Sequence, residues 1–145
     1  MNEFLQTLSD ERYAFLTAFA RILLGFLFFF QGYDAVFRVG IRQVADTYQD
    51  SFASHHFPQT ATLLGACFTS LAELVGGLLL ILGLLKYLAL YLLGIDLLVA
   101  CLGFGIMQPM WDMRHFFPRL FLLLFLLYVP SSWDTGSLDH ILFRS

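Results

Sequence analysis

Long runs of apolar residues, separated by short polar segments, dominate the chain. Three runs, at 13–37, 61–85 and 87–107, are each near the ~20 apolar residues that a helix needs to cross a bilayer. A fourth is unbroken only over 121–129, but it reaches spanning length at 111–133, between two tryptophans about 33 Å apart along a helix. Because the runs are continuous rather than alternating, they predict helices and not a β-barrel.

Composition supports a membrane setting. Of the 145 residues, 59% are hydrophobic and 13% are charged, and the mean hydropathy is +0.74, well outside the usual range of soluble domains. The polar segments 1–12, 38–59 and 131–145 are too short to form a separate domain. We therefore expect an all-α membrane protein, a bundle of four transmembrane helices over 1–145, with both termini on one side.

Net charge says little about partners other than lipid. The formal charge is -3, the isoelectric point is near 5.7, and the sequence has no basic run that would indicate nucleic-acid binding. Basic residues also fall almost evenly on the two sides of the predicted bundle, so the positive-inside rule does not decide its orientation. On the side of the termini they are Arg12, Lys86 and Arg144, and on the other side Arg38, Arg42, Arg114 and Arg119.

Three charged residues fall inside the predicted spans, where each costs roughly 2.5 to 3.5 kcal/mol at mid-bilayer. They are Arg21, Glu73 and Asp96, and each lies on a helix face made of small or polar residues. These faces are formed by Arg21, Gly25, Phe28 and Gly32; by Thr62, Ala66, Thr69, Ser70, Glu73, Gly76 and Gly77; and by Ala89, Asp96, Ala100, Gly103 and Met107. Such faces are expected to point toward protein.

Similar depths in the membrane predict an ion pair between Arg21 and Glu73, with Asp96 nearby. This buried charge network either locks the bundle or forms part of a proton or substrate route. Asp96 decides between these two roles. One arginine cannot neutralise the carboxylates of both Glu73 and Asp96, so one of the two carboxylates would hold a proton.

A second polar cluster lies where the fourth helix begins. Asp112, His115 and Arg119 share one helical face, where carboxylate, imidazole and guanidinium groups would meet at the membrane edge. They are candidates for binding an anion or a quinone head group, with Phe116, Gln31 and Asp34 completing the site. The alternative is an ordinary interfacial cluster in which Arg119 extends toward water.

Cysteine and histidine give weaker signals. Cys67 and Cys101 lie at similar depth, which permits a redox pair, although single cysteines in apolar helices usually act as small hydrophobic residues. His55 and His56 are adjacent in the loop, and a haem or metal role would need a partner such as His115. We expect no metal site and no intrinsic cofactor, with quinone as the candidate bound ligand.

Three segments resemble the DoxX family of small four-helix bacterial membrane proteins: "ARILLGFLFFFQGYDAVF", "LAELVGGLLLILGLLKY" and "GSLDHIL". The family's pattern falls on Arg21, Gly25, Gly32, Glu73, Gly76, Gly77, Ser137, Leu138 and Asp139. The resemblance implies a bacterial inner-membrane protein, similar to the small membrane subunit of thiosulfate:quinone oxidoreductase and to relatives linked with thiol and sulfur redox stress. It also implies cytoplasmic termini and a periplasmic long loop.

Three functions are compatible with these features. The first is a membrane subunit of a quinone-linked oxidoreductase of thiols or sulfur compounds, with protons handled by Glu73 and Asp96. The second is a non-catalytic anchor or assembly subunit of a larger complex, and the third is a carrier of protons or a small solute that works as an oligomer. The sequence has no nucleotide, flavin or metal motif, so catalysis would require a partner subunit.

Overall fold

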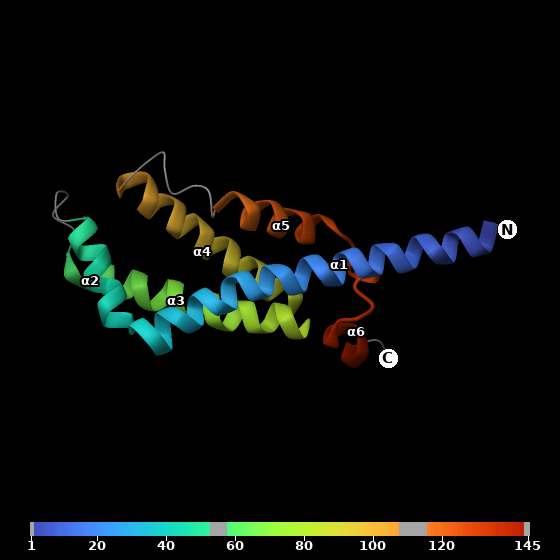
Figure 1. The fold of residues 1–145 in the computed structure, drawn as a ribbon, viewed down its shortest axis with the longest axis horizontal. Helices are drawn as coiled ribbons and strands as arrows, with labels where there is room; N and C mark the ends of the chain where they lie inside the picture. The colour runs from blue at the N-terminus through green and yellow to red at the C-terminus, as the bar shows by residue number, and fades with distance from the viewer. Residues whose placement is uncertain (1, 53–57, 108–115, 144–145) are drawn as a thin grey trace.

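The computed structural model describes residues 2–52, 58–107 and 116–143, and the regular elements of these ranges are all helical. Their order is α1 (Asn2–Tyr33), the π-helix η1 (Asp34–Val39), α2 (Ile41–Ser51), α3 (Gln59–Leu82), α4 (Lys86–Met107), α5 (Phe116–Tyr128), the short 3₁₀ helix η3 (Ser131–Trp133) and α6 (Leu138–Phe143). The predicted all-α membrane bundle is confirmed, and the two termini lie toward the same end of the molecule (Figure 1).

Among the described residues, three segments are long and apolar enough to cross a membrane: Glu11–Val39, Gln59–Leu82 and Lys86–Gly103. Helix α5 is apolar but shorter, at 13 residues, and its predicted extension back to Trp111 lies outside the described residues. Large apolar side chains cover the outside of the bundle, and Phe15, Leu64 and Leu102 are each 68% to 71% exposed. An apolar exterior of this kind suits contact with lipid.

Helices α1 and α3 are packed closely because both have glycines on the facing sides. A Cβ atom at Gly77 would lie 2.5 Å from the Phe29 nitrogen and 2.8 Å from the Gly25 oxygen. On the neighbouring side of α3, a Cβ atom at Gly76 would lie 2.8 Å from the Leu93 side chain of α4. The small-residue face predicted around Glu73 therefore does face protein, as the membrane packing of small residues requires. Leu24, Phe28, Leu80, Leu90, Leu97 and Leu126 fill the core between the helices.

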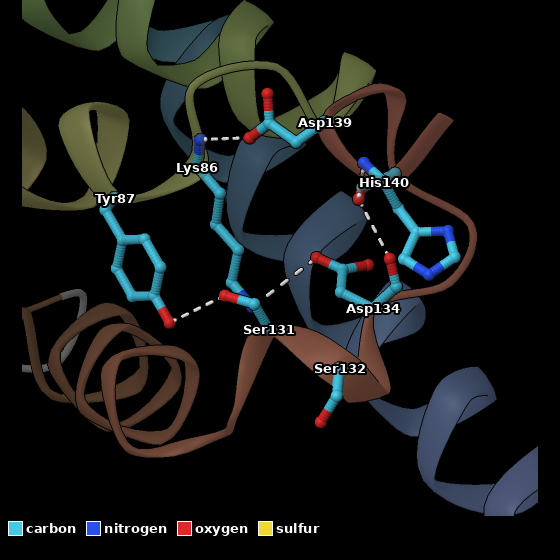
Figure 2. A pocket seen from close by; sticks show the side chains of 8 residues that line it. Lys86, Tyr87, Ser131, Ser132, Asp134, Asp139 and His140 are labelled. Atoms are coloured by element: carbon cyan, nitrogen blue, oxygen red, sulfur yellow. Dashed lines mark hydrogen bonds and ion pairs between the residues drawn. The ribbon is translucent and has the colours of Figure 1, made fainter. Parts of the chain in front are cut away.

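The turn between α3 and α4 is held by the C-terminal tail. Helix α3 ends at Gly83, which adopts a left-handed conformation, while the Leu84 N–H donates to the Leu79 carbonyl at 3.0 Å. Helix α4 then begins without an acidic residue in its own first turn. The Asp139 carboxylate of α6 caps the start of α4 instead, because it accepts the N–H groups of Leu85 at 2.8 Å and Lys86 at 2.9 Å (Figure 2).

The chain turns sharply after α1 through η1 and Gly40, and α3 then runs back beside α1 (Figure 1). Gly40 has φ +91°, a conformation open to glycine but strained for other residues, and α2 starts immediately after it. Apolar residues recur along α2 at Ile41, Val44, Ala45 and Tyr48 with helical spacing, so one face of α2 packs on the end of α3 (Figure 1). Helix α2 thereby covers the end of the bundle that is opposite the termini.

Candidate functional site

A polar cavity of about 230 Å³ lies where α1, η1, α2 and α3 meet. Its polar lining consists of Gln31, Asp34, Tyr48, Thr69, Ser70 and Glu73. We call it the Glu73 cavity. Helices α1 and α3 are apolar on their outer faces, whereas α2 exposes polar residues, so the cavity lies between two membrane-spanning helices and a helix with a polar outer face.

Glu73 is the buried acid of this cavity. It is only 6% exposed, and its Oε1 accepts a hydrogen bond of 2.6 Å from Nε2 of Gln31. Gln31 itself is exposed at the outer surface of α1. The pair therefore connects a buried carboxyl group to the outside of the bundle through one amide.

A second acid, Asp96, lies deeper in the bundle. Its side chain is 1% exposed, and its Oδ1 has no hydrogen-bond partner within the described ranges. Arg119 of α5 interacts electrostatically with both Asp96 and Glu73, and its guanidinium lies 5.1 Å from the ring centre of Phe28. Two carboxyl groups thus share one guanidinium, and this group of three is electrically neutral only when one carboxyl group holds a proton.

Tyr48 reaches the cavity from α2 and was not predicted from the sequence. Its hydroxyl is hydrogen-bonded to Thr69, and burial raises the pKa of the phenol, while the nearby charge of Glu73 raises it further. The phenol therefore stays protonated and can donate a hydrogen bond. The helical spacing of apolar residues in the segment 41–52 was the available signal, because it places Tyr48 on the inward face of an amphipathic helix.

The predicted Arg21–Glu73 ion pair is wrong. Arg21 is 1% exposed and instead pairs with Asp134, its Nε lying 3.2 Å from Oδ2. Its Nη1 donates to the carbonyls of Leu80 and Ile81 in the last turn of α3, where Leu80 also accepts the Gly83 N–H at 3.1 Å. Leu80 lies about 10 Å along α3 from Glu73. Arg21 therefore stabilises the end of the bundle near the termini, and Glu73 is hydrogen-bonded to Gln31 instead.

The residues predicted to bind quinone are partly brought together. Gln31 and Asp34 line the Glu73 cavity, and half-buried Arg119 interacts electrostatically with the buried acids while its Nη2 donates to the Leu27 carbonyl at 3.4 Å. Phe116 packs against the hydrophobic core, whereas Asp112 and His115 lie outside the described residues. The structure thus joins part of the predicted quinone cluster to Glu73 and Asp96, which the sequence analysis had treated separately.

The remaining candidates are less informative. Cys67 and Cys101 are free thiols and both are half-buried, so the redox pair stays a prediction. His55 and His56 belong to a segment that the structure does not describe.

Comparison with known proteins supports the resemblance noted in the sequence. The DoxX family model matches residues 16–106, more than half of the chain, and the matched range contains Gln31, Glu73 and Asp96. No curated protein and no solved structure matches the chain. The length of the family match is sufficient to conclude that this chain belongs to the DoxX family and is a multi-pass membrane protein.

Proposed function

We propose that the chain is an inner-membrane subunit of a quinone-linked oxidoreductase complex that acts on thiols or sulfur compounds, and that the Glu73 cavity binds the quinone head group. The observation that carries the proposal is the buried Glu73 carboxyl group, hydrogen-bonded to the exposed Gln31 at the edge of a cavity of about 230 Å³. The cavity combines an acid, an amide and a phenol, and such groups can hydrogen-bond and protonate quinone oxygens.

Each polar side chain has a role in this proposal. Gln31 donates a hydrogen bond to one quinone oxygen, and Tyr48 donates to an oxygen from the α2 side. Glu73 exchanges the protons that accompany reduction of a quinone to a quinol, and Arg119 stabilises negative charge near the acid. The electrons come from a redox cofactor of a partner subunit, so the chain supplies the binding site and proton handling.

Variants of the cavity should weaken binding of a short-chain ubiquinone to the purified full chain. We expect Glu73→Gln and Gln31→Leu each to raise the dissociation constant several-fold, because each alters or removes a neutral donor to a quinone oxygen and such a hydrogen bond contributes about 0.5–1.5 kcal/mol. Tyr48→Phe should have a smaller effect in the same direction. The measurement is a fluorescence-quenching titration in detergent, combined with mass spectrometry of quinone that copurifies with each variant.

The controls are Asp50→Asn and Gln43→Leu, which make the same chemical changes on the exposed face of α2. Both should bind the quinone as the wild type does. If the cavity variants fold and also keep wild-type affinity, the quinone site is rejected and the anchor or assembly function takes precedence. Proton flux in liposomes that is lost in Asp96→Asn would instead favour the carrier.

We propose that the termini lie in the cytoplasm and that the Glu73 cavity lies toward the periplasm. The support is the family resemblance, together with the placement of both termini at one end and α2 at the other (Figure 1). A reporter enzyme that is active only in the periplasm should be inactive when fused after Ser145 and active when inserted within 38–60. The opposite pattern would show that the protein has the reverse orientation, and the proposed role of the Glu73 cavity would be unaffected.

A further inference from the structure

Asp96 is a buried acid to which the proposed quinone site gives no role. Its side chain is 1% exposed, and its Oδ1 has no hydrogen-bond partner among residues 2–52, 58–107 and 116–143. None of the ion pairs found in those residues includes Asp96. The nearby core residues Leu93 and Leu97 are buried and apolar. An ionised carboxylate in such surroundings lacks the donors that would stabilise its charge, so the neutral acid is favoured.

Asp96 lies at the level of Glu73, on the neighbouring helix. Helices α3 and α4 are joined by a short turn and run in opposite directions (Figure 1), and they are in close contact where Gly76 meets the Leu93 side chain. Glu73 precedes Gly76 by about one turn of α3, or about 4.5 Å. Asp96 follows Leu93 by the same distance along α4, which is the same direction along the bundle. The two carboxyl groups are therefore neighbours across the interface between α3 and α4, and they interact electrostatically.

The two acids differ in the donors around them. Oε1 of Glu73 accepts a hydrogen bond from the uncharged Gln31 of α1, whereas Oδ1 of Asp96 accepts none in the described part of the chain. The other charged or titratable groups that interact with Asp96 there are Arg119 of α5 and Tyr48 of α2. One guanidinium balances one of the two carboxyl groups. The hydrogen bond from Gln31 favours Glu73 as the anion, and Asp96 is then the acid that holds the proton.

A sodium ion would supply the same positive charge as the proton. Such an ion needs several oxygen ligands, as other hard cations do. The described residues contain no group of three or more His, Cys, Asp or Glu side chains that could hold a metal ion. Leu93 and Leu97, next to Asp96 in the core, have no side-chain oxygen. Because a proton needs only one carboxyl oxygen, the groups around Asp96 favour a proton over a metal ion.

We propose that Asp96 stores a proton that Glu73 delivers to the bound quinone. The inference rests on the proposed quinone function and adds the source of one proton. When a quinone occupies the Glu73 cavity, the O–H bond of Asp96 breaks and an O–H bond forms on Glu73, which then donates to a quinone oxygen. The Asp96 carboxylate that results is stabilised by its electrostatic interaction with Arg119.

The transfer fits the balance of quinone reduction, which takes up two electrons and two protons to give a quinol. The electrons come from the redox cofactor of the partner subunit. One proton comes from Asp96 through Glu73, and the other comes from water at the cavity. After the quinol leaves, a proton from water reaches Asp96 through Glu73 and restores the neutral acid.

The first test is the pH dependence with which a short-chain ubiquinone binds the purified full chain, measured by fluorescence quenching in detergent. In the wild type the proton moves from Asp96 to Glu73, so binding takes up no proton and the dissociation constant should stay constant around neutral pH. In Asp96→Asn, Glu73 must take its proton from the buffer, and the dissociation constant should rise about tenfold for each unit of pH increase. Asp50→Asn, the same change on the exposed face of α2, should behave as the wild type does.

Infrared spectroscopy without quinone tests the stored proton itself. Wild-type protein with ¹³C-labelled aspartate carboxyl groups should show the C=O band of a protonated acid at its isotope-shifted position. Asp96→Asn should lose this band and Asp50→Asn should keep it. Addition of sodium chloride should leave the band unchanged.

Three outcomes would overturn the proposal. They are the absence of the labelled band, its loss on addition of sodium chloride, and the same pH dependence of quinone binding in the wild type and Asp96→Asn. A wild type that shows the band but binds no quinone would reject the proposed quinone function, and with it the delivery by Glu73, while the proton on Asp96 would stand. Should Asp96→Asn fail to fold, the labelled band and the pH dependence of the wild type decide.

Discussion

Replacement of Arg21 by methionine is expected to lower the free energy of unfolding by about 3–5 kcal/mol, the usual cost of breaking a buried ion pair from one side. The change leaves Asp134 with Lys86 as its ion-pair partner and removes the guanidinium hydrogen bonds to the carbonyls of Leu80 and Ile81. Helix α1 would then lose its polar link to both the end of α3 and the tail. Denaturant titration in detergent, followed by circular dichroism, measures the loss.

Arg38→Met is the matched control. Arg38 also pairs with an aspartate, Asp34, at 3.0 Å, but its side chain is 76% exposed, and exposed ion pairs contribute at most about 1 kcal/mol. Arg21→Lys should fall between wild type and Arg21→Met, because lysine keeps the charge without the planar set of donors. Comparable losses for Arg21→Met and Arg38→Met would contradict the assignment of Arg21 as the buried link.

The second large effect is expected for Gly77→Ala. The new Cβ would meet backbone atoms of α1 at Phe29 and Gly25, which cannot rotate away as a side chain can. The helices must separate, and the cost should reach or exceed the upper end of the about 1–3 kcal/mol typical of overpacked cores. The same titration measures it, and crosslinking between cysteines introduced on α1 and α3 reports the change in spacing.

Gly65→Ala provides the comparison on the same helix. A Cβ at Gly65 meets nothing within 4 Å, so alanine should be neutral or slightly stabilising through its better helix propensity. If both variants were equally stable, the contact between α1 and α3 would be looser than the structure indicates.

The sequence predicted helix faces well because the spacing of small and charged residues directly reports which side of a helix faces protein. Glu73 and Asp96 were placed inside the bundle on this basis, and both are buried. The partner of Arg21 was missed because partners were sought only among charged residues inside the predicted spans, at similar depth, and Asp134 lies just outside the span 111–133. Asp134 comes after α5, in a short polar segment, and only the three-dimensional path of the tail brings it to α1.

The cavity was harder to predict for a related reason. Gln31, Asp34 and Arg119 were predicted to bind the quinone, but their closeness to Glu73 depends on how α1 and α5 pack against α3. Tyr48 depends on α2, which had been treated as part of a polar loop even though its apolar residues recur with helical spacing. Local patterns therefore identified most of the polar groups, while packing between helices determined which of them share a site.

The role of the tail has a consequence for the order of events during synthesis. A ribosome makes Arg21 early, and α1 enters the membrane before Asp134 and Asp139 exist. Until those two residues are made, the guanidinium of Arg21 must rely on the carbonyls at the end of α3, and the start of α4 lacks its cap. A chain interrupted after α5 would have its apolar helices in place but would leave Arg21 without its carboxylate and the first N–H groups of α4 without their acceptor.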